Sequence, residues 1–165
     1  ERVFLRGRPR CAKTSRESRG GQSPGETDVL LQERELAFAS RSPPPEALLV
    51  FGCRFRERDF LYREDWERLE RAGVLPGGAV VAFSRDQDRK MYVQDRLQEE
   101  GARVWRLLEA GAHVYVCGSA NKMPGAVRDA LADVAAEHGG LGEEGGAAYV
   151  RGLTLKRRYH LECWS

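Results

Sequence analysis

Short apolar segments alternate with helical segments along most of this chain, and this alternation limits its fold more than any other feature. Apolar runs at 47–51, 79–83 and 113–117 are typical of strands buried on both faces of a sheet, and 159–164 predicts a last strand. Residues with helical spacing fill the intervals between them. Strands that alternate with helices predict an α/β fold, in which helices cover both faces of a parallel sheet.

The intervals between the strands carry their own helix signals. Pro124 suits the first turn of a helix, whereas the prolines at 43–45 end one. Gly101 and the glycines at 139–140 mark helix ends. We therefore expect helices at roughly 30–38, 63–72, 92–100, 104–108, 124–137 and 143–155.

The most informative stretch is 82–97, which combines the end of a buried strand, a polar turn and the start of a helix. Ligands of open α/β sheets bind at such places, because backbone donors and the helix dipole there favour anions. The stretch carries five side chains with phosphate-binding or base-binding groups: Ser84, Arg85, Lys90, Tyr92 and Gln94. An Arg at a strand exit accommodates the 2′-phosphate of NADP. The alternative is a solvated loop that enters an amphipathic helix.

Phe83-Ser84-Arg85 followed by Lys90-x-Tyr92-Val93-Gln94 resembles the 2′-phosphate and adenine site of cytochrome P450 reductase-like enzymes. Three further stretches match that family in the same order: Phe51-Gly52-Cys53-Arg54, Val114-Tyr115-Val116-Cys117-Gly118 and Cys163-Trp164-Ser165. Residues 29–165 therefore resemble the C-terminal NADP-binding part of an NADPH-dependent diflavin oxidoreductase. The resemblance implies the Rossmann-like fold of the ferredoxin–NADP reductase superfamily.

The resemblance also implies roles for individual residues. The polar side chains of 84–94 and Arg54 would bind NADPH, and Gly118 would let it approach the backbone. Cys117 would lie beside the nicotinamide, and Glu162, where the family more often has Asp, would stabilise the developing charge. Trp164 would stack on the flavin. The alternatives are a small buried hydrophobe for Cys117, a frayed terminus for Trp164 and a solvated side chain for Arg54.

Residues 1–28 depart from the family. Relatives carry there a strand and a Gly-Thr-Gly-x-Ala-Pro-Phe-Arg turn, whereas this chain has seven Lys and Arg residues against four acids and few apolar residues. We therefore expect 1–28 to be a basic, disordered segment outside the family and 29–165 to be a truncated NADP(H)-binding domain. Its parallel sheet would lack the first, central strand, because the apolar run at 3–5 is too short to replace it. FAD-binding residues and the FMN domain are also missing.

The function that the resemblance implies is hydride transfer from NADPH to FAD, with electrons passing through FMN to a protein acceptor. Within the family, the chain most resembles members that act in cytosolic iron–sulfur cluster assembly, whose acceptor is an anamorsin-like iron–sulfur protein. The features that point to this branch are 54–60, Trp66, 123–124 and 157–159. The chain alone would be inactive, since the flavin modules are missing.

Two other hypotheses remain open. One is a non-catalytic nucleotide-binding or interaction fragment, which the missing glycine turn favours. The other is a nucleic-acid-binding basic segment, which the lack of interleaved aromatic residues disfavours. Four scattered cysteines predict neither a metal site nor disulfides, and no signal peptide or membrane span is visible. We therefore expect a cytoplasmic protein with no membrane partner.

Overall fold

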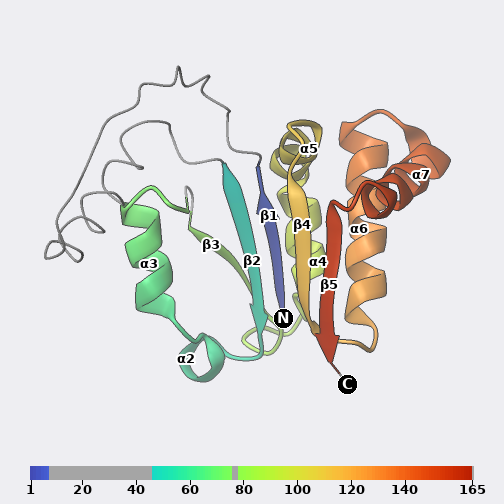
Figure 1. The fold of residues 1–165 in the computed structure, drawn as a ribbon. Helices are drawn as coiled ribbons and strands as arrows, with labels where there is room; N and C mark the ends of the chain where they lie inside the picture. The colour runs from blue at the N-terminus through green and yellow to red at the C-terminus, as the bar shows by residue number, and fades with distance from the viewer. Residues whose placement is uncertain (8–45, 76–77, 165) are drawn as a thin grey trace, which may run out of the picture. The chain divides into compact units, whose positions relative to one another are not determined.

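The computed structural model describes residues 1–7, 46–75 and 78–164. Five strands form one sheet in the order β3-β2-β1-β4-β5 (Figure 1). The strands are β1 (Arg2–Arg6), β2 (Ala47–Cys53), β3 (Ala79–Phe83), β4 (His113–Ser119) and β5 (Tyr159–Trp164). The α/β class and the four strands expected after residue 46 are confirmed.

The expectation of a parallel sheet without its central strand is wrong. β1 occupies the central position and pairs with β2 on one side and with β4 on the other, antiparallel to both. β2 with β3 and β4 with β5 pair in parallel, so the sheet is mixed. The five residues of β1 are enough to form this strand. Val3 and Leu5 alternate with polar or aromatic neighbours, which is the pattern of a half-buried strand.

The segment 1–28 is therefore not wholly outside the domain, since 2–6 complete the sheet. Its remaining part, its proposed boundary at residue 29 and the helix expected at 30–38 lie outside the described residues.

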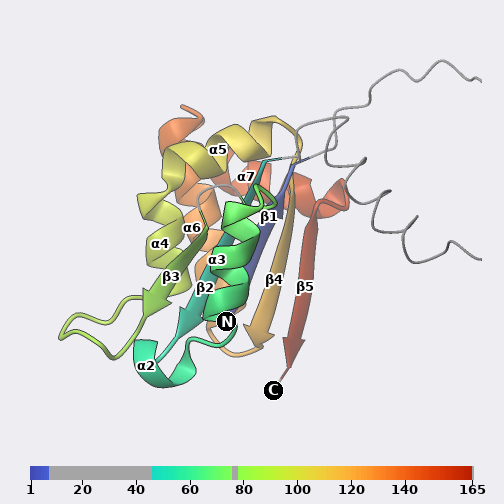
Figure 2. The ribbon, with the colours of Figure 1, turned by 90° about the vertical axis from the view of Figure 1, so that its left-hand side faces the viewer.

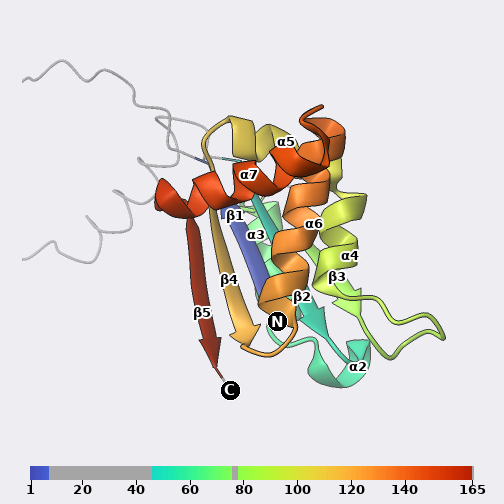
Figure 3. The same cartoon turned by 90° about the vertical axis from the view of Figure 1, so that its right-hand side faces the viewer.

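Helices cover both faces of the sheet, as expected. One face bears α4 (Val93–Glu99), α5 (Gly101–Glu109), α6 (Met123–His138) and α7 (Gly142–Leu155), and the other bears α3 (Arg63–Arg71) (Figure 2 and Figure 3). A single turn, α2 (Arg56–Asp59), follows β2 and was not predicted. None of the described helices is long and apolar enough to cross a membrane.

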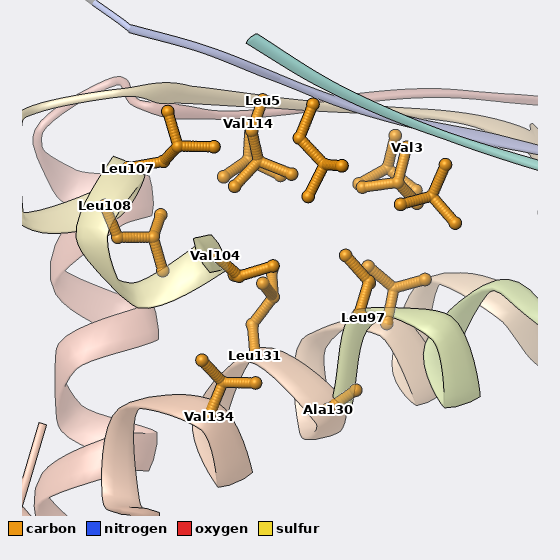
Figure 4. Packing of buried hydrophobic residues seen from close by; sticks show 14 of the residues in the cluster. Val3, Leu5, Leu97, Val104, Leu107, Leu108, Val114, Ala130, Leu131 and Val134 are labelled. Atoms are coloured by element: carbon orange, nitrogen blue, oxygen red, sulfur yellow. The ribbon is translucent and has the colours of Figure 1, made fainter. Parts of the chain in front are cut away.

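The main core lies between the sheet and α4–α7 (Figure 4). Val3 and Leu5 of β1 are fully buried in it, together with Leu97 of α4, Val114 of β4 and Leu131 of α6. Burying a side chain of this size contributes about 1.5–3 kcal/mol. A smaller cluster under α3 contains Ala47, Leu49 and Leu75, with Trp66 and Leu69 packed against it. The central strand β1 is thus held by the same core as its neighbours β2 and β4.

Candidate functional site

The carboxyl ends of β2, β3, β4 and β5 meet at one edge of the sheet (Figure 1). Ligands of α/β sheets bind at this edge. A cavity of about 330 Å³ opens at the ends of β2 and β3, and three of the predicted residues line it: Arg54, Ser84 and Tyr92. Half of the first group of predicted residues is therefore gathered around one cavity, whereas Arg85, Lys90 and Gln94 do not line it.

Hydrogen bonds hold the loop that follows β3 against the end of β2. The Ser84 N–H donates to the Cys53 carbonyl at 2.9 Å, and the Ser84 hydroxyl donates to the same oxygen at 3.3 Å. The Arg85 N–H donates to the Arg54 carbonyl at 2.9 Å. At the far end of the loop, the Tyr92 N–H donates to Asp95 at 2.7 Å, where α4 begins. Both ends of the predicted phosphate-binding loop are thus fixed.

The charged side chains of this cavity and its loop are of both signs and mostly open to solvent: Arg54, Arg85, Arg89 and Lys90 stand against Glu1, Asp59, Asp86 and Asp88. Arg54 forms an ion pair with Asp59 at 3.6 Å, and its side chain is 64% exposed. Arg85 and Lys90 are exposed and pair with no carboxylate in the described part of the chain. Gln94 is half-buried in the first turn of α4. Free guanidinium and ammonium groups are the donors that a phosphate needs.

The second group of predicted residues lies at the ends of β4 and β5. Cys117 and Glu162 are register partners, and the Cys117 thiol donates to the Glu162 carboxylate across 3.8 Å. Trp164 is paired with Ser119, and its carbonyl accepts the Ala120 N–H at 2.9 Å, while the residue is 64% exposed. Trp164 therefore belongs to the sheet and leaves its indole open to a partner surface.

Burial and then the Glu162 carboxylate raise the pKa of the Cys117 thiol. Both causes disfavour the thiolate. A thiol with a raised pKa stays neutral around pH 7, which suits a group that positions a ring and not a nucleophile.

Glu162→Gln is expected to lower the pKa of Cys117, because it removes the second largest cause of the shift. Alkylation by iodoacetamide requires the thiolate, so its rate at Cys117 should rise at a lower pH in the variant. Peptide mapping by mass spectrometry gives the rate for each cysteine. Cys53 is the internal control, since burial and Asp59 raise its pKa and Glu162 is not among the causes. An unchanged pH profile at Cys117 would contradict the pairing.

Arg2 is a residue at this edge that the sequence did not single out. It is the register partner of both Phe51 and Cys117, and its guanidinium lies over the Phe51 ring at 5.3 Å. Its charge acts to lower the pKa of Cys117, against the effects of burial and Glu162. Only the antiparallel pairing of β1 brings Arg2 here, and no local pattern predicts that pairing.

Two glycines, Gly52 and Gly118, lie between the two groups of predicted residues. They are near the ends of β2 and β4, the strands that flank β1. A Cβ on Gly118 would lie 2.7 Å from Met123 and 3.3 Å from the Cγ of Glu1, and Gly118 has a φ of +152°. A Cβ on Gly52 would lie 3.6 Å from the Cβ of Glu1, whose carbonyl accepts the Gly52 N–H at 2.7 Å. The exposed Glu1 side chain therefore lies against both strand ends.

These features define the class of protein. An α/β sheet whose strands end in a loop with phosphate-binding side chains is typical of a dinucleotide-binding domain. In the described part of the chain, no group of three His, Cys, Asp or Glu side chains could hold a metal ion.

The profile of the oxidoreductase NAD-binding domain family matches residues 28–129. Similar proteins include the sulfite reductase [NADPH] flavoprotein alpha-components of Pectobacterium atrosepticum and Serratia proteamaculans, 46% and 44% identical over 116 residues. That of Escherichia coli is 42% identical over 126 residues. These alignments cover 70–76% of this chain and 19–21% of the relatives, so the chain spans about a fifth of their length. The chain belongs to this family, as the NADP-binding part of a diflavin reductase, and the predicted resemblance is confirmed.

Proposed function

We propose that the chain binds NADPH and presents its nicotinamide to an FAD, from which electrons pass through FMN to a protein acceptor. The observation that supports this most is the arrangement of the two groups at one edge of the sheet. The loop of 84–92 lies at the ends of β2 and β3, and the Cys117–Glu162 pair lies at the ends of β4 and β5. The two groups thus lie on opposite sides of the central strand, as the two ends of a dinucleotide require.

In this proposal the loop holds the adenosine end. The Ser84 hydroxyl, the Arg85 guanidinium and the Lys90 ammonium bind the 2′-phosphate, and Tyr92 offers its ring to the adenine. Gln94 adds an amide at the start of α4, where the helix dipole favours an anion. Arg54, paired with Asp59 at 3.6 Å, lines the same cavity and binds the other phosphates.

The strands β4 and β5 hold the nicotinamide end. NADPH, when bound, supplies the hydride, and the protein positions it. The neutral thiol of Cys117 and the backbone at Gly118 contact the ring, and the Glu162 carboxylate stabilises the positive charge that develops on it. The exposed indole of Trp164 stacks on the flavin and yields this face to the nicotinamide.

Two electron acceptors are considered for the complete protein. The residues at 54–60, Trp66, 123–124 and 157–159 support an anamorsin-like iron–sulfur protein in cytosolic iron–sulfur cluster assembly. The names of the relatives support a sulfite-reducing partner instead. Both assignments place the protein in the cytoplasm, with FMN and, apart from the contact to Trp164, FAD bound by parts other than residues 29–165. A non-catalytic nucleotide-binding fragment is the alternative to both.

The proposal is tested by titrating the purified chain with NADP⁺ and with NAD⁺ in a calorimeter. We expect NADP⁺ to bind at least about tenfold more tightly, since one charge-assisted phosphate contact contributes roughly 1.5–3 kcal/mol. NADPH oxidation by the chain alone should stay at the buffer rate, because the acceptor of the hydride is a flavin. Absent binding, or equal affinity for both nucleotides, would refute the assignment.

A further inference from the structure

A groove beside the edge strand β5 is separate from the nucleotide site, which lies at the carboxyl ends of the strands. It encloses about 580 Å³ and is lined by residues of α6, α7 and β5: Arg128, Val150, Arg151, Thr154, Leu155, Tyr159 and Leu161. β5 is the last strand at this side of the sheet (Figure 3). The nucleotide cavity opens at the ends of β2 and β3. None of these groove residues has a role in the proposed NADPH site.

The backbone of β5 offers hydrogen bonds along this edge. The carbonyls of Arg158 and Trp164 accept N–H groups of Val114 and Ala120, at 2.8 and 2.9 Å. Alternate residues of a parallel strand face the same neighbour, so the N–H and carbonyl groups of Tyr159, Leu161 and Cys163 point away from β4. No strand in the described part of the chain lies beyond β5. Such an edge is a template for another strand.

A strand added to β5 would place some of its side chains in this groove. The part of the groove that they would contact is apolar. Leu155 is 85% exposed and Leu161 is 50% exposed, above a buried Val150. The Tyr159 hydroxyl is buried without a hydrogen-bond partner among the described residues. Burial raises the pKa of Tyr159 to about 12, so this hydroxyl remains a proton donor that lacks an acceptor.

Charge indicates what kind of segment fits. Arg128 and Arg151 form no ion pair or hydrogen bond with the described residues. The acids of α6 at 129, 133 and 137 line a neighbouring groove with Glu143. Asp129 is the one that also acts on Tyr159. Basic and acidic side chains are thus largely segregated, and the groove beside β5 is cationic.

We propose that this groove binds an acidic, extended segment of a partner protein that adds a strand to β5. The backbone of the segment pairs with the outward groups of β5, and an apolar side chain packs against Leu155 and Leu161. Its carboxylates bind Arg128 and Arg151. Strand addition of this type draws affinity from the backbone and specificity from alternate side chains. A second copy fits less well, since two-fold pairing of β5 would bring four arginines together.

The test uses a fluorescein-labelled, amidated peptide of sequence Glu-Thr-Leu-Thr-Glu-Thr-Glu, whose glutamates and leucine all face the groove when it is extended. Its binding to the full chain is followed by fluorescence anisotropy at low salt. We expect the double variant R128E/R151E to weaken binding about tenfold or more. The matched control R85E/K90E changes the net charge equally, but its two substitutions lie in the nucleotide loop. Its affinity for the peptide should therefore stay within twofold of that of the unmodified chain. Circular dichroism verifies that both variants fold.

A second arm examines the backbone. The same peptide with N-methyl groups on alternate residues keeps its charges and side chains but loses the donors that pair with β5, and its affinity should fall about tenfold or more. Equal binding of the methylated peptide, or equal loss in the two double variants, would overturn the proposal in favour of non-specific charge attraction. Dimerisation that depends on Leu161 would overturn it in favour of a second copy. Because the peptide does not contact the nucleotide loop, neither result depends on NADPH binding.

Discussion

Leu5→Ala is expected to lower the free energy of unfolding by about 2–5 kcal/mol, as is typical when a buried leucine becomes alanine. Leu5 has no exposed surface and lies at the centre of the sheet, where its register partners are Leu48 on β2 and Val114 on β4. The cavity left behind would be enclosed by two strands and by helices of the main core. A loss of this size is a large fraction of the roughly 5–15 kcal/mol that stabilises a typical domain.

Urea denaturation followed by circular dichroism measures this effect. Arg6→Ala in the same strand is the control, since Arg6 is exposed and such surface changes stay within about 0.5 kcal/mol. If Leu5→Ala had no more effect than Arg6→Ala, residues 2–6 would not be part of the folded domain. The result therefore decides between a completed sheet and the truncated one that the sequence led us to expect.

Arg85→Ala is expected to weaken the binding of NADP⁺ by about ten- to a hundredfold and that of NAD⁺ much less. Charge-assisted contacts to a phosphate contribute roughly 1.5–3 kcal/mol each, and only NADP⁺ carries the 2′-phosphate. Arg85 is exposed and pairs with no carboxylate in the described part of the chain, so its removal should not disturb the fold. The change in affinity can then be assigned to the phosphate.

Calorimetric titration of both nucleotides with the variant gives the two ratios directly. Arg89→Ala is the matched control, because Arg89 is an exposed arginine in the same loop that neither the motif nor the cavity includes. Its loss should change both affinities by less than about threefold. Equal weakening of NADP⁺ and NAD⁺ by Arg85→Ala would show that this arginine does not bind the 2′-phosphate.

Much of this domain can be predicted from sequence because its signals are local. β3 and β5 have the bounds expected from their apolar runs, and α6 differs by one residue at each end. Each pattern needs only neighbouring residues, since a strand or helix buries its apolar side chains at a fixed period. The predicted phosphate-binding loop is local in the same way, because Ser84, Arg85 and Lys90 follow one strand directly.

The single turn α2 escaped prediction because four residues are too few to show a period. Gly101 follows the last residue of α4 and its cap Glu100, as expected, but it also begins α5, which was expected only from 104. Local patterns therefore indicate elements better than the joints between them.

By itself, the sequence determined the α/β class, the order of the elements after residue 46 and the residue types offered to a dinucleotide. Only the tertiary structure decided how the sheet is completed. Val3 pairs with Val50 and Leu5 pairs with Val114, so each partner lies far along the sequence. Local periodicity does not specify such pairing. Long-range hydrogen bonds and burial, not local propensity, select the partners of a strand. The antiparallel direction of β1 then brings Glu1 and Arg2 to the carboxyl ends of the parallel strands.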